Sequence, residues 1–261
     1  MQTEVHVYSF SVAANVLLSF YPFLIVLISV SRMVFGMQPT LSAVQLALRD
    51  FFPDTFTSFL YTKGAHENLP LNSPTQLVSI VLLLFTANGI FEPLEVALNR
   101  VWGIRKNRSF FRNQLVSLAL IFVCGGLAIL SMMLTALNHA SLEGVLGFGA
   151  NFFPMLLFKM AAVPMAVLIL FLVYFFLPNG RPPLDRTIAA SIVIGVLMEV
   201  LKYASKLAWP WFQRKLENEY RIFQYSVTLI FLGFLASMLM LAGAEWAARG
   251  HRKDEVKQAG A

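Results

Sequence analysis

The chain carries little charge for its length. Only 13% of its 261 residues are Asp, Glu, Lys or Arg, and 57% are hydrophobic. A soluble globular domain usually has about 25% charged residues. This shortage excludes an ordinary water-soluble domain and indicates an integral membrane protein. Because no soluble stretch or linker interrupts the sequence, we expect residues 1–261 to form a single all-α membrane domain.

Cysteines and catalytic motifs are also scarce. Cys124 is the only cysteine, which excludes an intramolecular disulfide. The four histidines, at positions 6, 66, 139 and 251, are scattered without the spacing of metal ligands. The sequence has no Gly-x-Ser-x-Gly motif, phosphate-binding loop or Cys-x-x-Cys pair. We therefore expect no catalytic residues, no metal site, no cofactor and no enzyme activity.

Basic residues outnumber acidic ones, which gives a formal net charge of +6. A basic protein can bind nucleic acid, but the sequence shows no RNA-binding module with aromatic residues in a basic sheet. Lys and Arg residues beside apolar runs are instead expected from the positive-inside rule. We therefore expect contact with membrane lipids and not with nucleic acid.

Six apolar runs are candidates for membrane spans, each of which needs roughly 20 apolar residues. They cover residues 8–31, 74–90, 115–137, 153–177, 187–209 and 225–248. The first residues lack the basic segment and the cleavage site of a signal peptide, so we expect the first run to be retained as a span. The sequence therefore predicts a six-helix transmembrane bundle.

The distribution of Lys and Arg between the loops predicts the orientation. With the N-terminus inside, the inside segments hold eleven basic residues: Arg100, Arg105, Lys106, Arg108, Arg112, Arg181, Arg186, Arg249, Arg252, Lys253 and Lys257. The outside segments then hold six: Arg32, Arg49, Lys63, Arg214, Lys215 and Arg221. Because Lys and Arg are enriched in cytoplasmic loops, this count favours six spans with both termini in the cytoplasm.

The stretch 88–112 combines the densest charge with a helical pattern. Asn88, Glu92, Glu95 and Asn99 fall on one side of a helix, and apolar residues from Phe91 to Trp102 fall on the other. This pattern predicts an amphipathic helix over about residues 92–104, after the second span and at the membrane surface. We expect Pro93 to break or bend a helix that continues from the span, and Gly103 to end it.

Two readings of this helix remain open. Its polar face either meets water, or lines the cytoplasmic mouth of a polar cavity in the bundle. In the second reading, the counter-charge of Glu92 and Glu95 is Arg100 or the basic residues that follow. The first span has a comparable stripe that contains Asn15, Ser19 and Pro22. That stripe fits close helix packing or the wall of a cavity.

Charged residues also lie inside the later spans. Glu199 and Lys202 share a face of the fifth span with Tyr203 and Lys206. Since an unpaired carboxylate inside a membrane is costly, we expect Glu199 to pair with Lys202 or to be protonated. Such residues are candidates for function, although a purely structural ion pair is the alternative. Glu245 lies at the predicted cytoplasmic end of the last span, where it is either functional or solvated.

Four stretches carry a family resemblance. They are NGIFEPLEVALNRVWGI (88–104), LLSFYPFLIVL (17–27), FFLPNGRPPLDRTIAASIVIGVLMEVLKYA (175–204) and LAGAEWAA (241–248). In order, they resemble the marker segment, the first span, the Pro-Asn turn with the fifth span, and the terminal Gly-Ala-Glu of the YihY/BrkB membrane proteins. These were formerly classed as ribonuclease BN. The chain departs from them at Gln224-Tyr225-Ser226, where many members have Tyr-Gly-Ser.

The resemblance covers nearly the whole chain and implies a multi-pass protein of the bacterial inner membrane. It implies no settled activity. Because the residues offer no nuclease chemistry, we do not expect a ribonuclease. The polar stripes favour transport or translocation of a lipid-like or amphiphilic envelope molecule. The alternative is a structural or assembly factor of the cell envelope without transport activity. The oligomeric state stays open.

The predicted topology can be tested by labelling. The loop after the second span should face the cytoplasm, and the loop after the first span should face the other side. Single cysteines introduced at Asn107 and at Asn72 should therefore react with an impermeant thiol reagent from opposite sides of the membrane. Labelling of both positions from one side would contradict this orientation.

Overall fold

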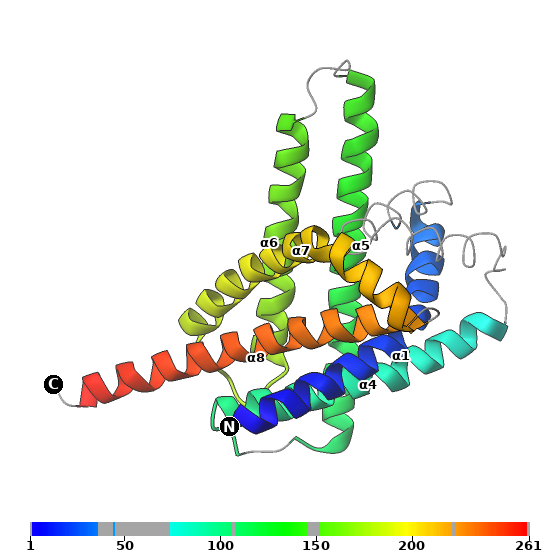
Figure 1. The fold of residues 1–261 in the computed structure, drawn as a ribbon. Coiled ribbons are helices and arrows are strands. Elements are labelled where there is room, and N and C mark those ends of the chain that lie inside the picture. The colour runs from blue at the N-terminus through cyan, green and yellow to red at the C-terminus, as the bar shows by residue number, and fades with distance from the viewer. Residues whose placement is uncertain are drawn as a thin grey trace.

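The chain folds into long helices, as the computed structural model in Figure 1 shows. The structure describes residues 2–35, 44, 74–105, 108–145, 152–220 and 223–259. Its long helices within these ranges are α1 (Gln2–Phe35), α4 (Pro74–Val101), α5 (Phe110–Val145), α6 (Phe152–Phe176), α7 (Leu184–Tyr220) and α8 (Gln224–Ala259). These ranges contain no strand, which confirms the all-α class.

Each predicted span corresponds to one of these helices, and most of the helices extend well beyond the span. Within the described residues, four helical stretches are long and apolar enough to cross a membrane: Val5–Val26, Phe111–Ala128, Leu184–Phe212 and Gln224–His251. α6 contributes a shorter apolar stretch, Val163–Phe176. A helical membrane protein is therefore shown, whereas the count of six spans stays a prediction.

The second span and the expected amphipathic helix form one element. α4 runs without interruption from Pro74 through Pro93 to Val101, so of the expected break or bend at Pro93 the break does not occur, and 92–104 is not a separate helix. Proline removes a single backbone donor, whose partner would be the carbonyl of Gly89. A helix of 28 residues retains its other hydrogen bonds. The helix ends just before Gly103, as predicted.

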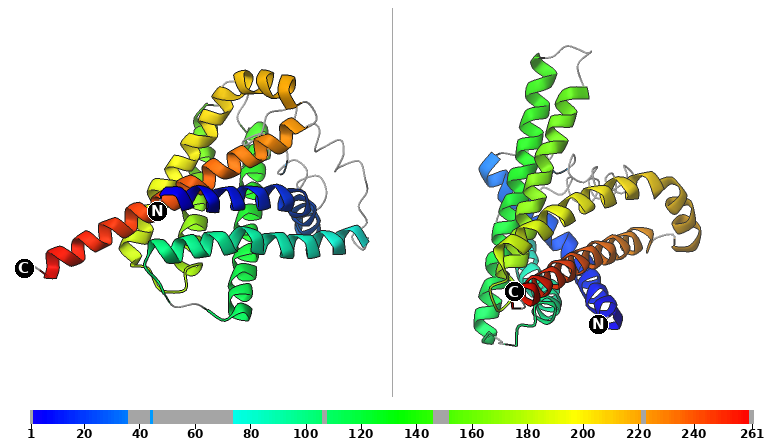
Figure 2. Two further views of the ribbon diagram at one scale, coloured as in Figure 1. Left: turned by 60° about the horizontal axis from the view of Figure 1, so that its bottom comes forward. Right: turned by 90° about the vertical axis from the view of Figure 1, so that its left-hand side faces the viewer.

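The helices form a packed body from which two helices project. α1 packs along α4 and α8, and α7 packs against α6 and α8. α5 and α6 stand side by side and extend beyond the other helices at one end, as Figure 1 and the right-hand view of Figure 2 show.

We call the opposite end of this pair, where α4 and α6 end and α5 and α7 begin, the closed end. Residues from all six helices and from the turn after α6 meet in one hydrophobic core near it. The buried members are Val12, Leu94, Ala97, Leu98, Val101, Leu120, Leu170, Val173, Tyr174, Leu177, Ala190, Ile194, Leu241, Ala244, Ala247 and Ala248. Burial of these side chains fixes the helix ends relative to one another.

Small residues allow close contacts between the helices around this core. A methyl group added at Gly243 of α8 would lie 2.2 Å from Cγ1 of Ile194 in α7 and 3.1 Å from the hydroxyl oxygen of Tyr174. One added at Gly89 of α4 would lie 2.1 Å from Oδ1 of Asn15 in α1. At both positions the neighbouring helix occupies the space that a side chain would need.

We expect Gly243→Ala to destabilise the protein by about 1–3 kcal/mol, because overpacking displaces Ile194 and Tyr174. The measurement is thermal unfolding of the purified protein in detergent. Gly126→Ala in α5 is the matched control, because a methyl group there meets no atom within 4 Å. Alanine favours helix over glycine by about 1 kcal/mol, so the control should be neutral or stabilising. Equal effects of the two changes would contradict the close contact.

Candidate functional site

The end of α4 is shaped by a glycine turn. The N–H of Gly103 donates to the carbonyl of Arg100 (3.2 Å), and that of Ile104 donates to the carbonyl of Asn99 (2.8 Å). Gly103 has a φ of 68°, in the left-handed region that glycine adopts without strain. This is the Schellman pattern, which satisfies carbonyls at a helix end. It turns the chain back across the closed end.

Two polar side chains near this turn are buried. Glu95 and Asn99, one helical turn apart on α4, have relative exposures of 5% and 8%. The side-chain amide of Asn99 donates to Oε1 of Glu95 (3.4 Å), and its Oδ1 accepts the backbone N–H of Asn179 (2.7 Å). Asn99 therefore connects α4 with the turn that follows α6, across 80 residues of sequence.

Arg108 binds the end of α6 from the loop between α4 and α5. Its guanidinium donates to the backbone carbonyls of Phe176, Leu177 and Pro178. These carbonyls lie where the helix ends, and within the described part of the chain no backbone N–H of a following turn donates to them. A guanidinium has five donors in a rigid planar arrangement, so one side chain can serve all three. Arg108 thus caps α6.

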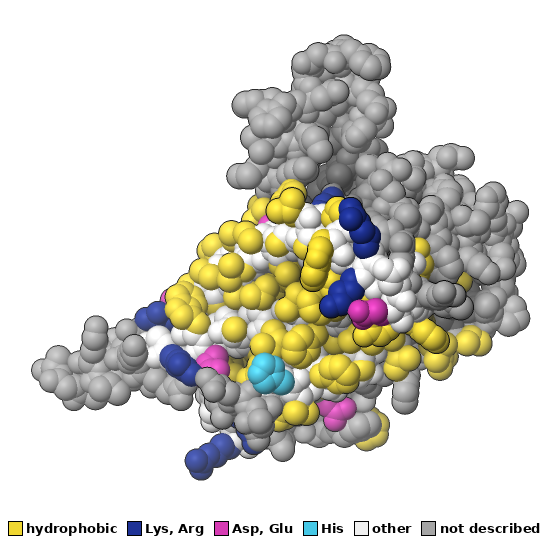
Figure 3. All heavy atoms as spheres, in the orientation of Figure 1, with side chains coloured by type: hydrophobic (Ala, Val, Ile, Leu, Met, Phe, Trp, Pro, Cys, Tyr) yellow, Lys and Arg dark blue, Asp and Glu magenta, His cyan; other side chains and the backbone are white. Residues whose placement is uncertain are grey.

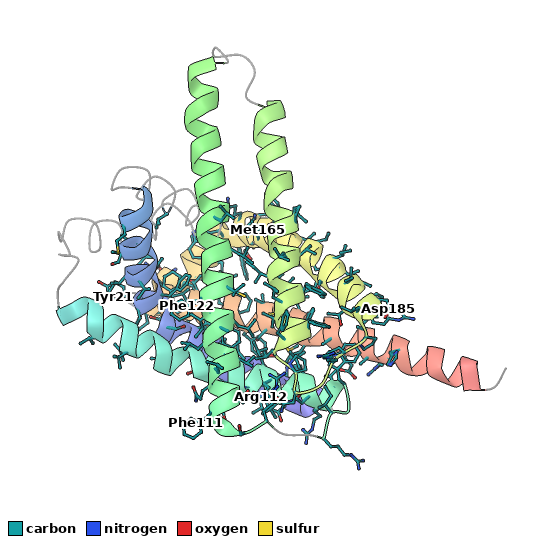
Figure 4. All side chains as sticks on the ribbon, turned by 180° about the vertical axis from the view of Figure 1, so that it is seen from behind. Tyr21, Phe111, Arg112, Phe122, Met165 and Asp185 are labelled. Atoms are coloured by element: carbon teal, nitrogen blue, oxygen red, sulfur yellow. The ribbon has the colours of Figure 1, made fainter. Side chains whose placement is uncertain are left out.

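Charges around Arg108 act on it in opposite directions. Burial lowers the pKa of its guanidinium below the ordinary value, the charge of Glu95 raises it, and the charge of Arg112 lowers it. Glu95 and Arg108 are therefore close enough for their charges to interact. Figure 4 shows Arg112 near the start of α5, where side chains crowd at the closed end, and Phe111 pointing away from the body.

Several buried polar atoms at this end are not satisfied. Oε2 of Glu95, Oδ1 of Asn179, Oδ1 of Asn113 and Nε1 of Trp102 have no hydrogen-bond partner within the described part of the chain. Buried polar atoms are usually paired, so unpaired ones mark strain or function. Among the described residues, no three His, Cys, Asp or Glu side chains are grouped so as to hold a metal ion.

The second polar feature lies within α7. Nζ of Lys202 and Oε2 of Glu199 are 2.5 Å apart, and their side chains are only 7% and 16% exposed. The expected pairing is therefore present. Lys202 also lies over the ring of Tyr203, with Nζ 5.4 Å from the centroid. Tyr203 and Lys206 are exposed, so the predicted stripe lies at the boundary between the packed and the exposed face of α7.

The polar residues of α1 take part in helix packing. Asn15 donates to the carbonyl of Ser11 (2.9 Å) and fills the space beside Gly89, and Ser19 donates to the carbonyl of Val16 (3.2 Å). Pro22 is buried within the continuous helix. These contacts favour the packing interpretation of the stripe.

The remaining predicted residues are not gathered with this cluster. Glu92 is exposed and Glu95 is buried, so of the two readings of this polar face the water-facing one fits Glu92 and the cavity-facing one does not. Glu92 belongs to an exposed stripe with Val96 and Arg100, spaced four residues apart. Glu245 pairs with the exposed Arg249 (2.6 Å) near the end of the apolar part of α8. The side chain of Asn88 lies outside the described residues.

Sequence reasoning missed two members of the closed end, Arg108 and Asn179. Arg108 was counted only as one of several loop charges, and Asn179 only as part of a turn. Their partners are 68 to 80 residues away in sequence. The available signal was the abundance of prolines after α6, since Pro182 offers no N–H to the carbonyl of Pro178 four residues earlier, which then needs another donor.

A comparison with family models matches residues 1–261 to Virulence factor BrkB. The chain belongs to this family. The match confirms the resemblance seen in the sequence and supports a membrane protein. No match was found among curated proteins, and none among solved structures. The BrkB family assignment therefore does not identify a substrate.

Loss of the Asn99 side chain should weaken the closed end. Asn99→Ala leaves the N–H of Asn179 without its acceptor, which we expect to cost about 1–3 kcal/mol of stability. Thermal unfolding in detergent measures the change. Glu92→Gln, on the exposed side of the same helix, is the control and should stay within about 0.5 kcal/mol of the wild type. An Asn99→Ala protein as stable as the control would show that this hydrogen bond contributes little.

Proposed function

We propose that this BrkB-family protein translocates a lipid-like or amphiphilic molecule across the bacterial inner membrane, along the polar boundary of α7. The observation that carries the proposal is the ion pair of Glu199 and Lys202. It lies in an apolar helix about 22–27 Å from Leu184, at 1.5 Å per residue. Charged residues at such a depth are rare and generally serve a pathway or relay.

The stability of the fold does not by itself explain the ion pair of Glu199 and Lys202. A buried ion pair loses hydration, and well-packed apolar residues of similar volume are often as stable or more so. The pair also stands at the edge of an apolar exposed face to which Val196, Val200 and Leu207 contribute. A functional role of the two charges explains why they occupy positions at which two apolar residues would stabilise the fold equally well.

The position of the pair suits an amphiphile. Figure 3 shows a surface over α7 and α8 that is largely hydrophobic, with separate charged groups. The exposed hydroxyl of Tyr203 and the amine of Lys206 continue the polar boundary toward that surface. A polar headgroup could follow this boundary, while its apolar chain stays in the lipid beside the exposed side chains. This path needs no wide channel through the bundle.

Reconstitution in liposomes tests the proposal. A lipid with a fluorescent headgroup is placed in both leaflets, and quenching from outside measures how fast the inner label becomes accessible. The wild type should transfer label faster than protein-free liposomes. If the pair stabilises passage by about 1.4 kcal/mol, its removal slows transfer about tenfold.

The two single variants should differ. Lys202→Ala leaves a carboxylate buried without its cation, whereas Glu199→Gln keeps an oxygen that can accept from Lys202. We therefore expect Lys202→Ala to reduce transfer and stability more than Glu199→Gln. Glu245→Gln, which changes a pair outside the boundary, is the control and should transfer at the wild-type rate. Wild-type transfer no faster than in protein-free liposomes would contradict translocation and favour a structural or assembly role.

A further inference from the structure

Arg108 has two sets of candidate acceptors at the closed end. Arg108 donates to the three carbonyls at the end of α6. A helix C-terminus carries partial negative charge, so a guanidinium there is stabilised by the helix dipole as well as by hydrogen bonds. This position holds the turn at 177–180 against the start of α5.

The second set of acceptors is the carboxylate of Glu95. Its Oε2 is buried and has no partner within the described residues, while Oε1 accepts only from Asn99. An unsatisfied buried carboxylate oxygen is costly, because its lost hydration is not replaced. Asn99, which donates to Glu95, also accepts the N–H of Asn179, and the carbonyl of the preceding residue, Pro178, is held by Arg108, so Glu95 and Arg108 lie in one cluster. The structure therefore favours the α6 carbonyls at the expense of Glu95.

We propose that Arg108 is a two-position latch, which exchanges between the carbonyls that end α6 and the free oxygen of Glu95. In the first position, seen here, the closed end is held together. In the second, Oε2 of Glu95 gains a charged donor while Oε1 keeps its bond from Asn99, and the carbonyls of residues 176–178 are released to water. Both positions use the charged guanidinium as donor, but only Glu95 offers it an opposite full charge, so the bond to the carboxylate can balance several bonds to carbonyls.

The exchange has a defined structural consequence. Once Arg108 leaves, Leu177 stays in the hydrophobic core, whereas Asn179 and Gly180 are connected to α4 by the bond from Asn179 to Asn99 and by the packing of Ile104 beside Gly180. These contacts are few compared with the core behind them. Asn179 and Gly180 would therefore separate from α4 locally, without unfolding of the bundle. Local openings of this kind control amide hydrogen exchange.

Hydrogen exchange of the turn distinguishes a latch from a fixed structural contact. The readout is the exchange of the Asn179 and Gly180 amides, measured by mass spectrometry on the full-length protein in detergent. Glu95→Gln keeps the acceptor for Asn99 but removes the charge that competes for Arg108. The latch therefore predicts exchange several-fold slower than in the wild type. A carboxylate that merely holds the end together predicts the opposite, since its loss would loosen the turn.

Changes at Arg108 complete the test. Arg108→Gln should speed exchange of the turn, and Arg108→Lys should do so too, because a lysine cannot reach three carbonyls with a planar group. The double variant Glu95→Gln, Arg108→Gln should match Arg108→Gln alone, because Glu95 acts only through Arg108. Glu92→Gln is the control and should leave exchange unchanged. Unchanged or faster exchange in Glu95→Gln, or additive effects in the double variant, would overturn the proposal.

Discussion

The backbone carbonyls that end α6 set the main constraint on this fold. The last carbonyls of a helix have no donor within the helix, and those that are partly buried need one from elsewhere in the chain. The sequence after α6 offers few backbone donors for these carbonyls, because Pro182 and Pro183 lack the N–H groups that a further turn would supply. Arg108 meets the need from another loop, and this fixes where α5 begins relative to α6. The packing of α4 and α7 around the same point then follows from the shared core.

Much of the fold could be read from the sequence because its signals are local. Long apolar runs predict helices, and each predicted span lies in one of them. Gly103 ends α4 as expected, since only the conformation of that residue is involved. The pairing of Glu199 with Lys202 could also be predicted from the sequence, because residues three apart on a helix are neighbours whatever surrounds them. Membership of the BrkB family was visible in the same way, from contiguous motifs.

The parts that could not be predicted depend on contacts distant in sequence. Helical periodicity places Glu92, Glu95 and Asn99 on one side of α4, yet only the last two are covered. The turn at Asn179 covers Asn99, and no sequence pattern within α4 predicts this contact. The expected break of α4 at Pro93 is absent for a related reason. The rule that proline breaks a helix concerns an isolated segment, whereas packing against α1 and α8 holds α4 continuous.

The contact between the first and last helices has a consequence for biosynthesis. The hydroxyl of Ser237 in α8 donates to the backbone carbonyl of Ser9 in α1 (3.1 Å), and Gly233 lies against Ala13. α1 is made early on the ribosome, but this face of it stays without its partner until α8 has been synthesised. Contacts so distant in sequence form slowly, and domains that depend on them pass through incomplete states. The nascent chain therefore has to reside in the membrane with α1 half-packed, where membrane chaperones or proteases would encounter it.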